Sequence, residues 1–369
     1  MMTRREMIVA TAAMTWAACT PKNAPCATTG KTALFWHPMG DAVGCELCPH
    51  ACILKEGKTG RCRTRQNVGG TLMTHAYSNP CALHVDPIEK KPFYHFLPAT
   101  RAYSLAIAGC NLRCLNCQNY TISQRSPDET DTRSLPPEKA VSEAIAEGCS
   151  SIAYTYSEPT VWFEYMFDTA KRARGAGLKN VMVTCGFINE APLRELSKYM
   201  DAVTLDVKSF SNDIYHKLNA GKLEPVLHSL EVAKKCGMWI EVSTLLVPGW
   251  SDDPEMVRKL CIWIKGRLGA GTPVHFLRFF PVYKLANLYP TPTKTLLSAQ
   301  KIAQQEGLSY AYVGNVAEAD SNTYCPSCKR PIVVRDGYLI KKVEIKNGLC
   351  SFCKTKINGV WEKGELVVE

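Results

Sequence analysis

The chain has 369 residues, 46% of them hydrophobic, which is enough to form one large buried core. Its length suggests two domains or one large domain with appendages. It carries 44 basic against 34 acidic residues, and the resulting net charge of +10 permits an acidic partner. The excess is spread without a block of five or more like charges, so it gives no evidence of specific nucleic-acid binding. The 18 cysteines are too many for an ordinary cytosolic enzyme, and their metal-ligand spacings favour metal sites over a disulfide scaffold.

The chain begins with a basic stretch that leads into a short apolar one, from Met1 to Ala18. The apolar stretch is too short to span a bilayer as a stable helix, so it predicts an export signal. Thr3-Arg4-Arg5-Glu6-Met7 resembles a twin-arginine signal, and Ala17-Ala18-Cys19 resembles a lipoprotein cleavage box. Residues 1–30 are therefore interpreted as a leader and linker that predict export or a lipid anchor. A cytoplasmic protein with a wrongly assigned start is the alternative.

Residues 31–99 form a cysteine-rich segment. It contains Cys45, Cys48, Cys52 and Cys62, with His50 among them, all within eighteen positions. This density of ligands predicts a metal site, and zinc or a second iron-sulfur cluster would both satisfy it. A redox-active cysteine pair is the alternative.

A loop with three cysteines follows the first strand of the next segment. The strand is predicted from Ala102 to Ala108, and Gly109 allows the backbone to turn tightly as it leaves. Cys110, Cys114 and Cys117 then follow at C-x3-C-x2-C spacing. Three thiolates can each hold one iron of a [4Fe-4S] cube, and without a fourth cysteine nearby one iron keeps an open coordination site. A zinc loop is the alternative, although zinc knuckles come as pairs of C-x2-C.

This loop resembles the signature of the radical S-adenosylmethionine (SAM) superfamily. The resemblance implies that the open iron binds the amino and carboxylate groups of SAM. It also implies that an electron from the cluster cleaves the sulfonium to give a 5′-deoxyadenosyl radical, which requires a low-potential electron donor as a partner. The superfamily usually has an aromatic residue before the last cysteine, where this chain has Asn116.

From about residue 100 the sequence alternates β-rich runs with helical stretches, which is typical of βα units and a parallel sheet. Further strands are predicted at Ser151–Tyr156, Lys179–Thr184, Ala202–Asp206, Met238–Leu246 and Val274–Phe280. Helices are predicted at 136–148, 161–174, 191–199, 224–236, 254–268 and 294–306. A complete eight-unit barrel would need about 250 residues. Six units over residues 100–317 therefore favour an α/β core built as a partial, splayed (βα)6 barrel.

Charged residues end two of these strands. Ser157 and Glu158 stand where the superfamily has a Gly-Gly-Glu-Pro-like turn, which implies that Glu158 binds the methionine ammonium of SAM. A helix N-terminal acid is the alternative for Glu158. Asp206 and Lys208 lie on one face of a strand and resemble the Asp-x-Lys element beside the cofactor in activating enzymes for glycyl radical proteins. A structural ion pair is the alternative for these two, and Cys185 either faces the site or packs in the core.

The composition changes after Tyr312-Val313-Gly314-Asn315, and residues 318–369 carry two C-x2-C pairs separated by 21 residues. The pairs are Cys325 with Cys328 and Cys350 with Cys353. They predict a rubredoxin-like ribbon around a tetrahedral ion, with zinc favoured and iron or an auxiliary cluster as the competitor. Because such a short segment has little core of its own, the ion would supply much of its folding free energy.

Several motifs together resemble one family within the superfamily. They are the Cys45 to Cys62 motif, Cys110 to Asn119, Tyr154 to Thr160, Tyr312 to Asn315 and Gly359-Val360-Trp361. They resemble the radical SAM enzymes of the AmmeMemoRadiSam system, which are similar to pyruvate formate-lyase activating enzymes and are linked with Memo-like and AMMECR-like partner proteins. The resemblance implies a [4Fe-4S] cluster, SAM, and hydrogen abstraction from a substrate that it does not identify. A glycyl radical activase is the first alternative, and a non-catalytic metal- or nucleic-acid-binding protein is the second.

Overall fold

The computed structural model describes residues 30–317, 319–361 and 366–367. The leader, with its twin-arginine and lipoprotein motifs, lies outside the described residues. In the part of the chain that is described, no helix has the length and apolar character needed to cross a membrane.

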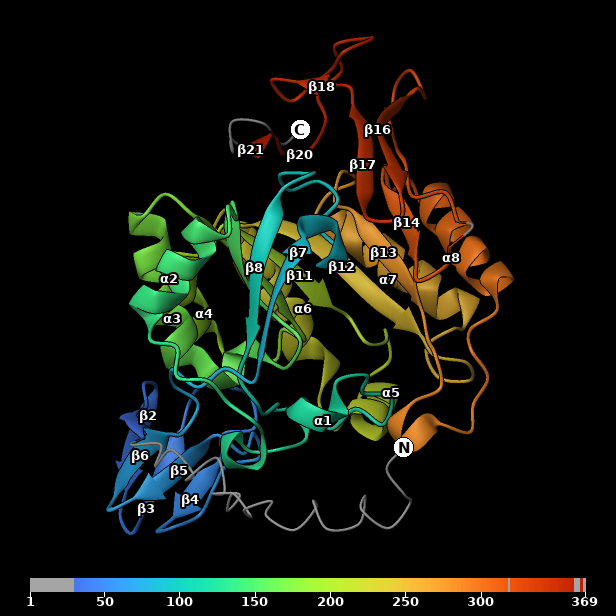
Figure 1. Cartoon of the computed structure of the whole chain (residues 1–369). Helices are drawn as coiled ribbons and strands as arrows, with labels where there is room; N and C mark the ends of the chain where they lie inside the picture. The colour runs from blue at the N-terminus through green and yellow to red at the C-terminus, as the bar shows by residue number, and fades with distance from the viewer. Residues whose placement is uncertain (1–29, 318, 362–365, 368–369) are drawn as a thin grey trace, which may run out of the picture.

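The centre of the molecule is one eight-stranded sheet covered by helices (Figure 1). Its strands, in spatial order, are β14 (Ala311–Gly314), β13 (Val274–Arg278), β12 (Trp239–Leu246), β11 (Ala202–Asp206), β10 (Lys179–Thr184), β9 (Ser151–Tyr154), β8 (Arg101–Ala106) and β7 (Ala82–Pro87). Strands β8 to β14 pair in parallel, whereas β7 pairs antiparallel with β8. The sheet is therefore of mixed type, with its parallel strands consecutive in sequence.

Helices connect the parallel strands. They are α1 (Tyr120–Ser123), α2 (Pro137–Ala146), α3 (Phe163–Gly175), α4 (Glu190–Ser197), α5 (Asn212–Ile214), α6 (Leu223–Lys235), α7 (Pro254–Arg267) and α8 (Thr293–Gln305). Short 3-10 turns lie at Ile88–Lys90, Pro127–Glu129, Pro159–Trp162 and Tyr283–Leu285, and a π-helical turn at Tyr215–Asn219.

All six predicted strand-helix pairs are present, as β8 to β13 and α2, α3, α4, α6, α7 and α8. The two edge strands, β7 and β14, were not predicted. β7 reads ALHVDP and is only partly buried, so it lacks the continuous apolar run of a central strand. β9, by contrast, is buried at all four positions. The parallel order brings the carboxyl ends of β8 to β13 to one edge, where α/β proteins keep their functional side chains.

The N-terminal segment forms two small antiparallel sheets below that edge in Figure 1. One contains β1 (Lys31–Thr32), β6 (Thr71–Thr74) and β5 (Arg65–Val68), and the other β2 (Trp36–Met39), β3 (Ala42–Cys45) and β4 (Ile53–Lys55). The buried Arg65 donates to Glu164 on α3, and both side chains are 1% exposed. Breaking such a buried pair costs roughly 3–5 kcal/mol, so this contact fixes the N-terminal segment to the helical layer.

The C-terminal segment lies at the opposite end of the sheet (Figure 1). Its strands are β15 (Thr323–Tyr324), β16 (Pro331–Asp336), β17 (Leu339–Val343), β18 (Ile345–Lys346), β19 (Leu349–Cys350), β20 (Gly359–Val360) and β21 (Leu366–Val367). Its core is shared with the sheet, since Tyr94, Tyr310 and Tyr312 pack in one cluster with Ile332 and Trp361. The ribbon is therefore anchored to the central fold by aromatic packing.

Candidate active site

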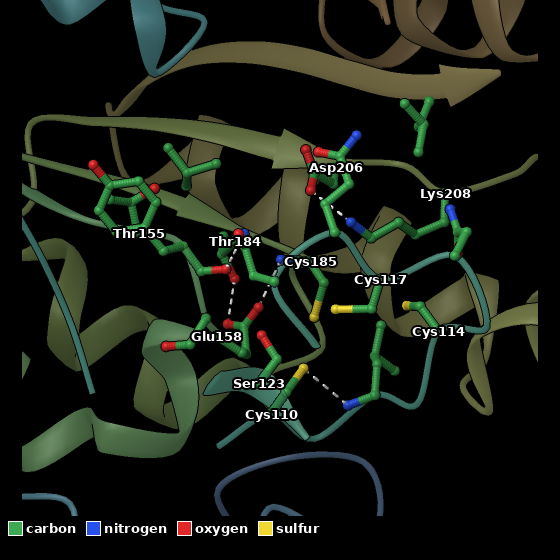
Figure 2. A pocket seen from close by; sticks show the side chains of 18 of the residues that line it. Cys110, Cys114, Cys117, Ser123, Thr155, Glu158, Thr184, Cys185, Asp206 and Lys208 are labelled. Atoms are coloured by element: carbon green, nitrogen blue, oxygen red, sulfur yellow. Dashed lines mark hydrogen bonds and ion pairs between the residues drawn. The ribbon is translucent and has the colours of Figure 1, made fainter. Parts of the chain in front are cut away.

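A cavity of about 280 Å³ lies at the carboxyl ends of the parallel strands. Its walls include residues from the cysteine loop and from the ends of β9, β10 and β11, as Figure 2 shows. The wall residues with potential chemical roles are Cys110, Cys114, Cys117, Asn116, Ser157, Glu158, Cys185, Asp206, Lys208 and Lys91. The structure thus brings together the three loop cysteines and all four residues predicted to bind the cofactor.

The cysteine loop is held by the backbone of a distant segment. Arg113 N donates to Asn219 O at 2.9 Å, and Leu115 N donates to Leu218 O at 2.9 Å. Gly109 has φ +107°, and a Cβ there would lie 2.5 Å from Thr64 Cγ2, so only glycine fits this turn. In Figure 2 the sulfurs of the three cysteines turn toward one common space.

Buried thiols dominate the electrostatics of this loop. Burial raises the pKa of Cys117 to about 11, with the neighbouring Cys114 adding to the effect. Burial also places the pKa of Cys110 well above its usual range, and Glu158 reinforces this. A metal centre would have to displace these protons on binding, because thiolates are the ligands.

The loop fits a [4Fe-4S] cluster and SAM. It offers three cysteine side chains that face one space. Among the described residues, these three sulfurs do not belong to a group whose ligand atoms all lie within 4.8 Å of one another. They are therefore spread wider than a single ion needs, as a cube requires. Asn116 Oδ1 is buried without a hydrogen-bond partner in the cavity wall, which leaves an acceptor for a bound ligand.

Glu158 is 2% exposed, and its carboxylate is tightly held. Oε1 accepts from Thr184 Oγ1 at 2.6 Å and from Thr160 N at 3.0 Å, and Oε2 accepts from Cys185 N at 2.8 Å. A carboxylate has about four lone-pair positions, so one remains for a ligand in the cavity. The contact with Thr160 N caps the turn Pro159–Trp162, so the structural alternative, a helix N-terminal acid, is present, while the binding role of Glu158 stays a prediction.

Ser157 lines the cavity, but its hydroxyl donates to Ile107 O and accepts from Trp162 Nε1 at 3.2 Å. Tyr156, which replaces the first glycine of the family turn, has φ +67°. This left-handed conformation is strained for a tyrosine. Its hydroxyl donates to Asp86 and accepts from Lys91 Nζ at 2.9 Å, so buried polar contacts hold the turn in a glycine-like shape.

Asp206 and Lys208 form an ion pair in the cavity wall, with Lys208 Nζ 2.6 Å from Asp206 Oδ2. Asp206 also accepts from Ser243 Oγ on β12. Burial opposes protonation of Lys208, but Asp206 and the Cys114 sulfur outweigh it and place the pKa of Lys208 well above its usual range. Lys208 is therefore a fixed cation beside the cysteine loop, unsuited to proton transfer at neutral pH.

Two side chains that the sequence did not single out complete the site. Asn219 Nδ2 donates to Cys114 Sγ at 3.1 Å from the π-helical turn. Lys91 lines the cavity, and burial lowers its pKa to about 8 against the opposing effect of Asp86. Both come from segments without a recognisable motif.

Cys185, for which the sequence left both a site role and core packing open, lies in the cavity wall, and its Sγ is 3.7 Å from Asn111 Oδ1.

The other two cysteine groups lie apart from this cavity. Cys45, Cys48, Cys52 and Cys62 line a small separate cavity beside the cysteine loop. Cys325, Cys328, Cys350 and Cys353 bring their sulfurs within 4.8 Å of one another in the C-terminal ribbon. There, Cys325 Sγ lies 3.5 Å from Cys353 Sγ, and Cys328 Sγ 3.9 Å from Cys350 Sγ. A tetrahedral site with metal-sulfur bonds near 2.3 Å has sulfurs about 3.8 Å apart, so this group could bind a single metal ion.

Comparison with known proteins relates the central part of the chain to a superfamily. The sequence profile of the radical SAM superfamily matches residues 105–261. An uncharacterized protein of Methanocaldococcus jannaschii is 44% identical over 332 residues, covering 89% of this chain and 99% of that protein. The pyruvate formate-lyase-activating enzyme of Staphylococcus epidermidis is 31% identical over 175 residues, covering 43% of this chain and 66% of that enzyme. The chain thus matches just under two thirds of the length of that activating enzyme.

Solved structures show only a distant likeness. Streptococcus suis SuiB bound to SAM aligns with a TM-score of 0.47 and 13% identity, over 62% of this chain and 53% of that one. A domain of a Bacteroides vulgatus pyruvate formate-lyase-activating enzyme aligns with a TM-score of 0.40 and 14% identity, over 45% of this chain and 99% of that one. From the superfamily match and the homology to activating enzymes, we conclude that the chain contains a radical SAM domain and is a radical SAM enzyme, and this superfamily implies a [4Fe-4S] cluster and SAM.

Proposed function

We propose that Cys110, Cys114 and Cys117 hold the [4Fe-4S] cluster and that the cavity beside them binds SAM. When bound, these two groups supply one-electron cleavage of SAM to a 5′-deoxyadenosyl radical, which takes a hydrogen atom from a substrate that stays unidentified. The observation that carries the proposal is the convergence of the three cysteines with Glu158, Asp206 and Lys208 on one cavity.

The chain's own side chains then have distinct tasks. Glu158 uses its remaining lone pair to accept from the methionine ammonium, while Thr184 and Cys185 N fix the carboxylate in place. Ser157 positions this turn through its hydrogen bond to Ile107 O. Lys208, held by Asp206, keeps a positive charge beside the cysteine loop, where it offsets the negative charge of the thiolates.

Titration of SAM into the reduced, anaerobically reconstituted protein tests this proposal. We expect a saturable change in the electron paramagnetic resonance (EPR) spectrum, because SAM would bind the open iron. A Cys149→Ala variant is a matched control, since this buried cysteine does not line the cavity, and it should respond like the wild type. A spectrum that SAM leaves unchanged would contradict the assignment.

A glycyl radical activase is the second candidate. Two observations favour it, namely the homology to pyruvate formate-lyase-activating enzymes and the position of Asp206 and Lys208 in the cavity wall. On this alternative the substrate is a backbone glycine of a partner protein. Incubation with a glycyl radical protein encoded nearby in the genome should then produce a glycyl radical EPR signal, and only in the presence of SAM.

At a finer level, we infer membership of the AmmeMemoRadiSam system, supported by the motifs that run from Cys45 to Trp361. The partners would be a low-potential electron donor and Memo-like and AMMECR-like proteins, and the leader would direct export or lipid anchoring at Cys19. We further propose zinc for the four cysteines of the C-terminal ribbon, supported by their compact spacing. For the fold, we propose segments at 31–99, 100–317 and 318–369, with the middle one built as a splayed, partial (βα)6 barrel.

A further inference from the structure

The four N-terminal cysteines share one small cavity at the junction with the active site. Cys45, Cys48, Cys52 and Cys62 all line it, and Leu47, Leu54 and Val161 form apolar parts of its wall. The cysteines come from β3, from the loop before β4 and from the turn before β5. A group bound here would be largely screened from solvent, as iron-sulfur clusters commonly are.

This cavity adjoins the loop that carries the first cluster's ligands. Asn111, which follows Cys110, lines it, and its backbone oxygen accepts from His50 Nε2 at 2.7 Å. On the other side, a Cβ at Gly109 would lie 2.8 Å from Cys62 O. The two cysteine groups are therefore neighbours in space, and His50 is engaged by the loop.

The distances between the four N-terminal sulfurs distinguish this cysteine group from a site for a single metal ion. In the described part of the chain, the C-terminal cysteines are the group whose ligand atoms all lie within 4.8 Å of one another. The N-terminal four are not in such a group, although they line one cavity. Cys110, Cys114 and Cys117 are not in such a group either, and the proposed function assigns them to a [4Fe-4S] cluster. A multi-iron cube matches this wider spread better than one tetrahedral ion does.

Polar groups around the cavity suit bound thiolates. Arg65 is 1% exposed and directs Nη1 toward Cys45 Sγ at 3.7 Å, so a buried positive charge faces the ligands. Thr64 Oγ1 lies 3.2 Å from Cys62 Sγ. Charges and hydrogen bonds of this kind stabilise iron-sulfur clusters and set their reduction potentials.

We propose that Cys45, Cys48, Cys52 and Cys62 hold a second [4Fe-4S] cluster beside the first. Four cysteine ligands leave no iron open, so this cluster cannot bind SAM, and the chemistry that it offers is one-electron transfer. The proposal rests on the proposed function only in taking the neighbouring loop as the first cluster's site.

The test is a full-length variant with Cys110, Cys114 and Cys117 all replaced by alanine, reconstituted anaerobically with iron and sulfide. We expect about four irons and four sulfides per chain, against about eight of each in the wild type. Dithionite should produce an EPR signal that SAM does not alter. Adding Cys48→Ser and Cys62→Ser to this variant should abolish both the iron and the signal. Because no step of this test requires SAM cleavage, its failure is distinguishable from failure of the proposed function.

A matched control replaces Cys149, Cys236 and Cys261, which line neither cavity, and should keep the wild-type iron content. The reciprocal variant, with Cys45, Cys48, Cys52 and Cys62 replaced by alanine, should keep about four irons and a SAM-sensitive signal. A folded triple variant would overturn the proposal if it contained no iron or only two irons with two sulfides. A zinc content of this variant clearly above the one equivalent per chain proposed for the ribbon would also overturn the proposal.

Discussion

Asn219 donates its side-chain amide to Cys114 Sγ at 3.1 Å, and this contact joins the π-helical turn to the cysteine loop. Hydrogen bonds to cluster sulfurs stabilise the reduced, more negative state and so raise the reduction potential. An Asn219→Ala substitution should therefore make the midpoint potential of the cluster proposed at Cys110, Cys114 and Cys117 more negative. An EPR-monitored redox titration measures the shift. Asn212→Ala, on the preceding helix and bonded to Leu223 N, is the control, and equal potentials in all three proteins would contradict the prediction.

Glu158→Gln tests the carboxylate at the end of β9. The glutamine amide keeps the shape of the carboxylate but loses its charge. It also places an NH2 group against one of two hydrogen-bond donors, the Thr184 hydroxyl or Cys185 N. Losing a charge-assisted hydrogen bond costs about 1.5–3 kcal/mol, so the Kd for SAM should rise roughly 10- to 150-fold. SAM titration followed by EPR gives this Kd. An unchanged Kd, with a full cluster, would show that Glu158 only caps its turn.

Asp86 holds the strained Tyr156 turn through buried contacts to Tyr156 OH and Lys91 Nζ. Burial alone would raise the pKa of Asp86, but Lys90, Lys91 and Tyr156 outweigh it and hold that pKa well below its ordinary value of 3.8. Asp86→Asn leaves Lys91 buried without its counter-ion and should cost about 3 kcal/mol of unfolding free energy near pH 7. Chemical denaturation measures this loss.

The pH dependence of the same substitution has a definite sign. Because the folded-state pKa of Asp86 is depressed, its stabilisation is present above pH 3.8 and is lost as the pH falls below that value. The stability difference between wild type and Asp86→Asn should therefore shrink under acid conditions. A difference that grows as the pH falls would disprove the role given to this carboxylate.

Removing the ion proposed for the C-terminal ribbon should affect stability more than chemistry. Cys350→Ser removes one of four converging sulfurs, and the ribbon packs on Tyr94, Tyr310 and Tyr312 at the end of the sheet away from the cavity. We expect loss of about one zinc per chain and a lower melting temperature, with unchanged iron content. Elemental analysis and calorimetry measure these quantities. Ser327→Ala, in the other knuckle of the same ribbon, is the control. Loss of iron in Cys350→Ser would contradict a separate structural site.

The sequence alone predicted the repeating part of the fold, because β-rich runs that alternate with helical stretches identify β8 to β13 and their helices. It missed β7, where His84 and Asp86 interrupt the apolar pattern of an edge strand. It also missed β14, a strand of only four residues at the other edge of the sheet, where it pairs with β13 alone. Short edge strands are defined by their pairing partner more than by their own residues.

The site was predictable where its chemistry depends on local spacing. The cysteine loop and the two strand-end motifs were found, and the structure places them around one cavity. Asn219 and Lys91 carry no local signal, since each reaches the site only through the tertiary fold. The orientation of Ser157 was equally beyond the sequence, because its hydroxyl depends on the nearby Ile107 carbonyl and the Trp162 indole.

The central claim is that Cys110, Cys114 and Cys117 support reductive cleavage of SAM. The most direct measurement is the yield of 5′-deoxyadenosine after anaerobic reconstitution and incubation with dithionite and SAM. Wild-type protein should form 5′-deoxyadenosine well above a Cys114→Ala variant, while Cys149→Ala should match the wild type. A wild-type yield no higher than that of Cys114→Ala, in protein that retains its iron, would contradict the account.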